Sequence, residues 1–396
     1  MKKLCFVVQR YGMEVNGGAE LLTRQLAEKL ILFYDIEVLT SKAIDYQTWK
    51  DEYAEDETVL NGVRVRRFSV ASTRSRTAFT RVNNMFINNQ LPKSREREWL
   101  EKQGPFVPEL IEYIRKHKND YDLFLFFTYL YYPTAAGITE VADKAILVPF
   151  AHDEPFIKMH MFKGVFRKPA GICYMTTEEK DFIQRKFWNY DVPYAMGGAG
   201  VDVPEVVDAE RFKEKYGVNN YIVYAGRIDD GKNCPELFSF FQKYKKAHPS
   251  DLKLILMGKP VIPIPEDPDI MSLGFVSEED KFDGIAGSQL LVLPSKFESL
   301  SIVVLEAFYL HRPVLVNGEC EVLKGHIEKS HGGYYYHNYT GFASKLTQLT
   351  HFADINREMG DNGYRYVMEN YRWDIICRRM KSLIDYAIDK QKGVRG

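Results

Sequence analysis

Cysteine is scarce in this sequence, and its spacing suggests neither a disulfide framework nor a metal site. The 396 residues include five cysteines, which are Cys5, Cys173, Cys234, Cys320 and Cys377. They are odd in number, lie far apart and form no CxxC or Cys/His pattern, which excludes a disulfide scaffold and a zinc centre. We expect buried or free thiols in a reducing compartment.

The sequence also lacks long hydrophobic runs and an excess of either charge. Its most apolar stretch, Leu123 to Tyr132, is about half the ~20 residues that a membrane-spanning helix needs. The apolar run behind Lys2 and Lys3 ends at Val8, which is too short for the core of a signal peptide. Lysine and arginine total 53 against 54 aspartate and glutamate, so no basic field favours nucleic acid. We therefore expect a cytoplasmic protein that binds no nucleic acid.

What the sequence does contain is a regular alternation of short apolar runs and longer amphipathic ones. Val, Ile, Leu and Phe occupy both faces of the short runs, which is typical of parallel strands covered by helices on both sides. In the first half we expect strands at 4–9, 36–40, 63–68, 123–127 and 145–149, and helices at 19–32, 109–118 and 178–188. In the second half we expect strands at 221–225, 253–257, 290–293 and 313–316, and helices at 233–247, 280–287, 301–309 and 364–392.

A stretch rich in glycine, Gly197 to Pro204, separates the two series. The simplest interpretation is an α/β protein with two doubly wound parallel-sheet domains, at 1–196 and 197–370. In such sheets ligands bind at the carboxyl ends of the strands. We therefore expect the site in a cleft between the two domains.

Two glutamates eight residues apart form the strongest motif. Glu298 falls in the loop after a predicted strand and Glu306 about two turns along the next helix, so both can face one cleft. Between them, Ser299, Leu300 and Ser301 open the helix, whose free N–H groups bind phosphate or sugar oxygens. The competing interpretation is a surface glutamate plus an ordinary helical one. The position after a buried strand, in the second of two similar domains, favours a site.

A tight turn after the first strand of the second domain carries two cations. Arg227 supplies a bidentate donor and Lys232 a compact charge, where a diphosphate can be held. Negative charge grows on a diphosphate that leaves during sugar transfer, so fixed cations there stabilise the transition state. A structural salt bridge is the alternative, and the glutamate motif about seventy residues downstream favours the first interpretation.

In the first domain, Gly17 and Gly18 open the first predicted helix. Glycine lets a substrate approach the backbone closely, and a helix N-terminus favours an anion. The glycine spacing does not fit a dinucleotide-binding motif, and no P-loop string is present. His152 follows a predicted strand end, which is a functional position in an α/β sheet, although a structural histidine is an equal alternative.

No set of residues predicts a metal site. Asp153-Glu154 and Asp229-Asp230 are pairs without further ligands. Lys232 lies beside the second pair and favours neutralisation by a cation of the protein itself.

Residues 70–106 are less regular and carry six basic side chains, Arg74, Arg76, Arg81, Lys93, Arg95 and Arg97. One interpretation is a solvated insertion. The other is a cationic, partly mobile surface on the acceptor side, in peripheral contact with phosphate or anionic lipid headgroups at the inner membrane surface.

Together these residues resemble glycosyltransferase family 4 on the GT-B fold, over nearly the whole chain. The motifs occur in the family's order: the loop at 17–18, His152-Asp153, the linker at 200–202, Gly226-Arg227 with Lys232, and Glu298 to Glu306. The segment 370–373 is similar to the family's final aromatic turn. The resemblance implies two Rossmann-like domains facing a cleft, with residues 371–396 as a helix that crosses back to the first domain.

The resemblance also implies a site. The implied donor-binding residues are Gly17, Gly18, Arg227, Lys232, Glu298, Ser299, Leu300, Ser301 and Glu306. Arg227 and Lys232 would hold the donor diphosphate, and Glu306 the ribose hydroxyls. Glu298 would contact the transferred sugar, with His152 near its anomeric carbon.

The activity implied by the resemblance is that of a retaining hexosyltransferase that needs no metal and no cofactor. It would move a hexose from a nucleotide diphosphate sugar to a glycan or polyprenyl-linked acceptor in bacterial surface polysaccharide biosynthesis. The chain departs from the family's usual Glu-Gly-Phe-Gly string, since Ser299 and Ser301 replace the glycines, but serine also suits a helix N-terminus. Two alternatives stay open: a nucleotide-sugar 2-epimerase of GT-B-like fold, and a non-catalytic nucleotide-sugar-binding partner.

Overall fold

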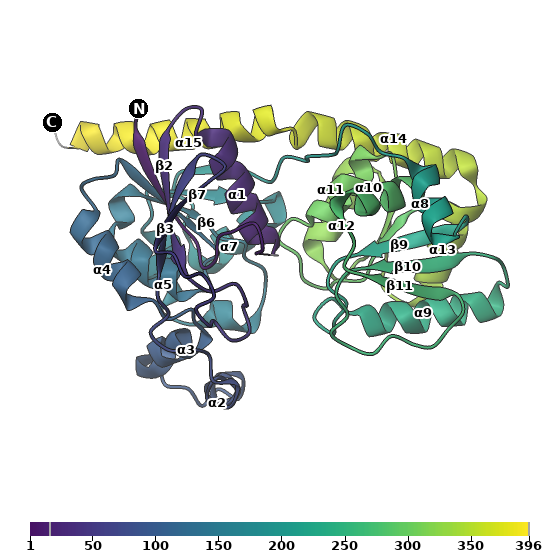
Figure 1. The fold of residues 1–396 in the computed structure, drawn as a ribbon, viewed down its shortest axis with the longest axis horizontal. Helices are drawn as coiled ribbons and strands as arrows, with labels where there is room; N and C mark the ends of the chain where they lie inside the picture. Colours follow the sequence, from purple (N-terminus) through teal and green to yellow (C-terminus); the bar gives the residue numbers. More distant parts are fainter. Residues whose placement is uncertain (16, 395–396) are drawn as a thin grey trace. The chain divides into compact units, whose positions relative to one another are not determined.

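The chain folds into two compact units, each built around its own sheet (Figure 1). The structure is a computed structural model, and it describes residues 1–15 and 17–394. Unit 1 comprises Met1–Gly198 and the chain from Ile376 onward, and unit 2 comprises Ala199–Ile375. The expected α/β class with two doubly wound sheets is confirmed.

Unit 1 contains an eight-stranded sheet in the order β3-β4-β2-β1-β5-β6-β7-β8, in which only the β3–β4 pair is antiparallel. The strands are β1 (Lys3–Val7), β2 (Asp35–Ser41), β3 (Glu57–Leu60), β4 (Val63–Phe68), β5 (Leu123–Phe127), β6 (Ala145–Val148), β7 (Gly171–Tyr174) and β8 (Tyr194–Met196). The α-helices are α1 (Gly18–Leu30), α2 (Arg76–Ile87), α3 (Glu96–Gln103), α4 (Pro108–His117), α5 (Tyr132–Gly137), α6 (Phe162–Arg167), α7 (Thr177–Phe187) and most of α15 (Trp373–Val394). Short 3-10 helices are η1 (Lys93–Arg95), η2 (Ile138–Glu140), η3 (Ala142–Lys144) and η4 (Pro155–Lys158).

Unit 2 contains a six-stranded, fully parallel sheet in the order β11-β10-β9-β12-β13-β14. The strands are β9 (Tyr221–Ala225), β10 (Lys253–Met257), β11 (Ile270–Gly274), β12 (Leu291–Leu293), β13 (Val314–Asn317) and β14 (Gly333–Tyr336). The helices are α8 (Ala209–Tyr216), α9 (Cys234–Ala247), α10 (Glu278–Gly287), α11 (Ile302–Tyr309), α12 (Glu321–Ser330), α13 (Tyr339–His351) and α14 (Ala353–Asn370). β9 and β12 are buried at every residue, which explains their unbroken apolar sequences.

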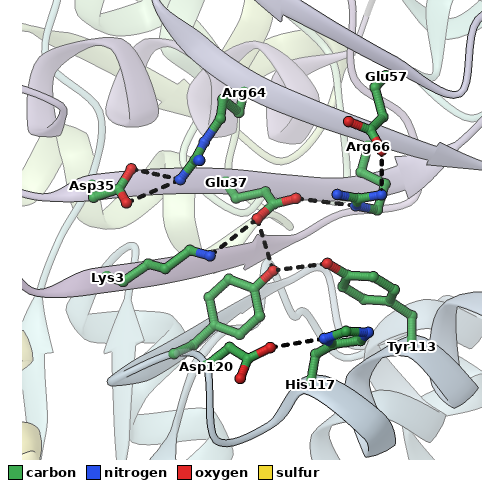
Figure 2. A network of polar contacts seen from close by, with 10 residues as sticks. Lys3, Asp35, Glu37, Glu57, Arg64, Arg66, Tyr113, His117 and Asp120 are labelled. Carbon is green, nitrogen blue, oxygen red and sulfur yellow. Dashed lines mark hydrogen bonds and ion pairs between the residues drawn. The ribbon is translucent and has the colours of Figure 1, made fainter.

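The amino-terminal end of the unit 1 sheet is closed by a network of polar contacts (Figure 2). At its centre, Glu37 of β2 accepts hydrogen bonds from Arg66 at 3.1 Å and from the Tyr121 hydroxyl at 2.8 Å, and lies 3.6 Å from Lys3. These partners lower the pKa of Glu37 although its burial acts in the opposite direction. Since α/β sheets bind ligands at the carboxyl ends of their strands, the candidate site is sought at the opposite ends.

The segment 70–106 is more regular than its sequence indicates. α2 and α3 form there, and they lie together at one end of unit 1 (Figure 1). Trp99 of α3 stacks on Phe156 with 4.9 Å between ring centroids and donates to the Asn83 side chain at 3.1 Å. Because these contacts come from distant parts of the chain, local periodicity does not indicate them.

The predicted helix at 364–392 is interrupted. α14 ends at Asn370 and α15 begins at Trp373. Tyr371 between them offers its carbonyl to the Val201 N–H at 3.1 Å, and the Trp373 ring lies against Gly200. Within residues 1–15 and 17–394, no helix combines the length and apolarity needed to cross a membrane.

Candidate functional site

The carboxyl ends of β9 and β12 carry the charged residues of the two main motifs. The two strands are neighbours, and the strand order reverses between them because β10 follows β9 on one side and β13 follows β12 on the other. Loops after such a pair meet at the edge of the sheet where α/β proteins bind ligands. The loops are residues 226–233 and 294–301.

The loop after β9 is a tight turn fixed by Asp229. Gly226 adopts a φ of 153°, which favours glycine, and the Tyr224 hydroxyl donates to the Arg227 carbonyl at 2.6 Å. Asp229 accepts the Lys232 backbone N–H at 2.8 Å and contacts the Arg227 guanidinium. The Arg227 side chain is still 43% exposed, so part of it is accessible to a ligand.

Lys232 and Glu298 join the two loops. Nζ of Lys232 lies 2.7 Å from Oε1 of Glu298, although the residues are 66 positions apart in sequence. Both side chains are partly shielded from water, at 29% and 12% exposure, which strengthens their attraction relative to a surface pair. The structure therefore brings a cation of one motif to an acid of the other.

The loop after β12 ends in a left-handed backbone conformation at Ser301, with φ 63° and ψ 75°. An L-residue adopts this conformation at a cost of about 1–2 kcal/mol. The buried Ser301 hydroxyl has no hydrogen-bond partner among the described residues. α11 begins at the next residue, and the first N–H groups of a helix have no intrahelical acceptor. The junction thus presents backbone donors and a hydroxyl to a ligand.

Glu306 lies on α11 as predicted, but its cation is one that the sequence analysis missed. Lys281 of α10 lies 2.9 Å from a Glu306 oxygen and 2.9 Å from Glu278. Burial raises the pKa of the Glu306 carboxyl, with Lys281 acting against it. Burial lowers the pKa of Lys281, but the two acids outweigh it and the net pKa is raised. Glu298 and Glu306 therefore belong to separate ion pairs, and no sequence pattern marks Lys281 because the contact depends on the packing of α10 beside α11.

Two further residues that the sequence analysis missed hold the start of the 294–301 loop. The side-chain amides of Asn233 and Asn317 both donate to the Pro294 carbonyl, at 3.2 and 3.1 Å. Asn233 directly follows the Lys232 motif and Asn317 ends β13. Asparagine at these loop positions was a usable signal, because its side chain readily bonds to backbone.

In unit 1, Gly17 and Gly18 begin α1, but an ion pair of the chain itself occupies this helix end. Glu20 in the first turn accepts from the Arg10 guanidinium at 2.6 Å, and both side chains are buried. A Cβ on Gly17 would lie 2.2 Å from a Glu20 oxygen, so a side chain at this position would displace the Glu20 carboxylate. The neighbouring residue Asn16 lies outside the described residues.

His152 follows β6 and is half-buried beside an acid. Its Nε2 lies 3.8 Å from Glu154, whose other oxygen accepts the Tyr129 hydroxyl at 2.6 Å. Glu179 supports the same loop, because it accepts the Ala151 N–H at 2.5 Å. Burial raises the pKa of Glu179 to about 8, against the lowering effect of its backbone hydrogen bonds. The structure thus gives His152 a defined setting within unit 1.

Comparisons with known proteins extend these observations. Residues 219–351 match the family described as glycosyl transferases group 1. The segment contains both loops, with Arg227, Lys232 and Glu298, and also Lys281 and Glu306. Residues 219–351 form a group 1 glycosyltransferase domain.

Solved structures similar to the whole chain share its fold. Sucrose-phosphate synthase from Thermosynechococcus elongatus has 14% identity and a TM-score of 0.73, with 100% of each chain covered. HepE of Anabaena, in complex with UDP and glucose, has 13% identity and a TM-score of 0.70, with coverage of 97% and 100%. WaaG, a glycosyltransferase involved in lipopolysaccharide biosynthesis, has 12% identity and a TM-score of 0.65, with coverage of 96% and 98%. The expected GT-B fold is confirmed.

No curated protein matches the chain in sequence. Among residues 1–15 and 17–394, no three His, Cys, Asp or Glu side chains gather closely enough to hold a metal ion. Gly17, Gly18 and His152 lie outside the matched domain, in unit 1.

Proposed function

We propose that this glycosyltransferase transfers a hexose from a nucleotide diphosphate sugar to a glycan or polyprenyl-linked acceptor, with retention of anomeric configuration. The observation that carries the proposal is the Lys232–Glu298 pair at 2.7 Å, where the loops after β9 and β12 meet. In support, solved structures with the same fold include HepE in complex with UDP-glucose.

The chemistry follows from the charges. When the sugar–phosphate bond breaks, negative charge grows on the leaving diphosphate, and Arg227 and Lys232 stabilise it more in the transition state than in the ground state. The N-terminus of α11 and the Ser301 hydroxyl add hydrogen-bond donors for the same oxygens. These donors are held in place by the fold, so little reorganisation is needed during reaction.

The two acids take different tasks in this proposal. Glu298 is bound to Lys232 and contacts the transferred sugar. When the diphosphate binds Lys232, the Glu298 carboxylate becomes able to accept hydrogen bonds from the sugar hydroxyls. Glu306, bound to Lys281, accepts from the ribose hydroxyls. For His152, Gly17 and Gly18 we propose the roles that the family resemblance implies, which are contacts with the transferred sugar and with the donor.

The experiment is a thermal-shift screen over UDP-, GDP-, ADP- and dTDP-sugars, since a ligand that binds the folded state raises the unfolding temperature by mass action. The stabilising donor is then assayed for hydrolysis and transfer in the wild type, Glu298→Ala and Arg227→Ala, with and without EDTA. We expect turnover that resists EDTA, a product of retained configuration by NMR, and severe losses in both variants. Wild-type-like turnover in both would reject the site. An isomerised sugar without acceptor would identify an epimerase, and binding without turnover a non-catalytic partner.

We further propose that α2 faces anionic headgroups at the inner membrane surface, where bacterial surface polysaccharide is assembled on lipid carriers. Arg76 and Arg81 of α2 and Lys93 beside it are exposed, and Ile87 of α2 is 47% exposed. Vesicles with about a third of phosphatidylglycerol should sediment the wild type at low salt. Arg76→Glu with Arg81→Glu should abolish this, and binding by the double variant would contradict the proposal.

A further inference from the structure

A buried histidine that the proposed mechanism does not use holds the loop that begins α11. His326 of α12 is fully buried. Its Nε2 lies 2.7 Å from the Leu300 carbonyl oxygen, and its Nδ1 lies 3.1 Å from the hydroxyl oxygen of Tyr366. The Tyr366 oxygen lies 3.2 Å from the hydroxyl of Tyr371. The four groups form a continuous chain of hydrogen bonds inside unit 2.

The partners define which nitrogen of the ring carries the proton. A carbonyl oxygen only accepts, so Nε2 of His326 is protonated and donates to Leu300. In the neutral ring Nδ1 then accepts from the Tyr366 hydroxyl, which in turn accepts from Tyr371. The two tyrosines therefore favour the one tautomer that can hold the Leu300 carbonyl.

This hydrogen bond determines the direction of one peptide group. In a trans peptide the carbonyl of Leu300 and the N–H of Ser301 point in opposite directions. Because the carbonyl points at the buried His326, the Ser301 N–H points away from it. No hydrogen bond from this N–H is found within residues 1–15 and 17–394. The hydroxyl of the same residue is likewise buried and unpartnered among those residues.

We propose that His326 is a positioning residue that keeps the Leu300–Ser301 peptide turned so that the Ser301 N–H faces the donor diphosphate. The inference rests on the proposed function, because it assigns a ligand to this N–H. If the peptide turned over, the Leu300 carbonyl would face the phosphate, and two acceptors would oppose each other. The strained φ of 63° at Ser301 persists because the surrounding contacts, this hydrogen bond among them, hold it.

The test compares His326→Leu, which removes the donor, with His326→Gln, whose amide can donate to the same carbonyl. Binding of UDP and of inorganic pyrophosphate is measured by calorimetry well under the unfolding temperature of each variant. We expect His326→Leu to bind both at least tenfold more weakly, and His326→Gln to recover to within about threefold of the wild type. The matched control is Leu346→Ala, which truncates the core on α13 and should reduce stability but not affinity.

Three outcomes would overturn the inference. One is wild-type affinity in His326→Leu, and another is a loss of affinity in Leu346→Ala that matches the loss in His326→Leu. The third comes from ¹⁵N NMR of the imidazole rings, assigned with His326→Gln, if His326 proves to be protonated at Nδ1 alone. If His326→Leu does not fold, Tyr366→Phe replaces it, because this variant lacks only the hydroxyl that bonds to Nδ1 of His326. We expect Tyr366→Phe to bind two- to fivefold more weakly, and unchanged affinity would contradict the role of the hydrogen-bond chain. If the wild type binds neither UDP nor pyrophosphate, the proposed function itself fails. If the wild type binds them and the His326 variants bind equally well, only this inference fails.

Discussion

The loops at the carboxyl ends of the two sheets are built in different ways. In unit 2 the loops after β9 and β12 are joined by Lys232 and Glu298, whose charged ends remain partly open to solvent. In unit 1 the loop before α1 is closed by Arg10 and Glu20, which are both buried. The buried Arg10–Glu20 pair stabilises the fold, whereas the more accessible Lys232–Glu298 pair can exchange a partner for a ligand. The comparison supports the proposal that the donor diphosphate binds in unit 2, and it can be tested in both units.

The largest expected effect comes from breaking the pair in unit 2. Lys232→Met and Glu298→Gln should each reduce kcat/KM for the donor that stabilises the wild type by about 10²–10³-fold, because each removes a fixed group from the reacting centre. Steady-state kinetics measures this, with unfolding temperature as the check on stability. The control Lys215→Met removes a 2.8 Å ion pair with Asp280 elsewhere in unit 2 and should keep its activity. Equal activity losses in all three variants would show that activity depends on the ion pairs of unit 2 in general and not on the Lys232–Glu298 pair in particular.

In unit 1 the corresponding break should cost stability. An alanine at Gly17 would displace the Glu20 carboxylate from Arg10, and uncoupling a buried pair costs about 3 kcal/mol. Gly18→Ala is the matched control, because no atom lies within 4 Å of a Cβ there, and it should be neutral or stabilise by about 0.5–1 kcal/mol. Urea unfolding followed by tryptophan fluorescence reports on this, since Trp49, Trp99 and Trp188 lie in unit 1. Similar midpoints for the two variants would contradict the role assigned to the pair.

Much of the fold could be predicted because strands such as β5 and β9 have unbroken apolar sequences, while β4 alternates valine with arginine. The strands at 63–68, 123–127, 221–225 and 253–257 begin and end where the sequence places them. The helices α2 and α3 could not be predicted, because contacts such as Trp99 with Phe156 stabilise them from a distance. The break at Tyr371 likewise depends on its bond to Val201 and not on a local signal.

The candidate site could be predicted where the charged residue lies within a sequence motif. It could not be predicted where the partner comes from another helix. Arg227, Lys232 and Glu298 follow strand ends in sequence, so their place at the carboxyl edge of the sheet follows from the α/β pattern. Lys281 and His326 could not be assigned in advance. Their partners, Glu306 and Leu300, are reached only once the order of helices around the sheet is known.

A second test in unit 1 uses the pH dependence of stability, which depends on the buried Glu179 carboxyl beside the His152 loop. Burial raises the pKa of Glu179 to about 8 in the folded protein, from 4.5. At Glu179 the folded state therefore binds a proton more tightly than the unfolded chain. The resulting contribution to the free energy of unfolding is complete under about pH 4.5 and is lost as pH rises through 8.

Glu179→Gln should flatten the dependence of the unfolding free energy on pH between about 4.5 and 8, measured by urea titrations at four pH values. The variant should also lose about 1–3 kcal/mol at low pH, because one backbone N–H loses a good acceptor. Glu96→Gln removes another buried carboxylate that accepts two backbone N–H groups, so its loss of stability is the control for a weaker acceptor. An unchanged slope in Glu179→Gln would show that the group stays ionised.

The smallest expected effect concerns the left-handed residue at the start of α11. Ser301→Gly relieves a strain of about 1–2 kcal/mol but makes the unfolded chain more flexible, so we expect a net stabilisation of about 0.5–1 kcal/mol, or roughly 1–4 °C in unfolding temperature. His331→Gly is the matched control, since His331 has φ 52° at the end of α12 and should show a similar gain. The two differ in ligand binding: Ser301→Gly loses the buried hydroxyl and gains a freer peptide, so it should bind UDP a few-fold more weakly, while His331→Gly should bind as the wild type does. If both variants gained stability and neither lost affinity, the serine at 301 would be a tolerated replacement with no contact to the donor.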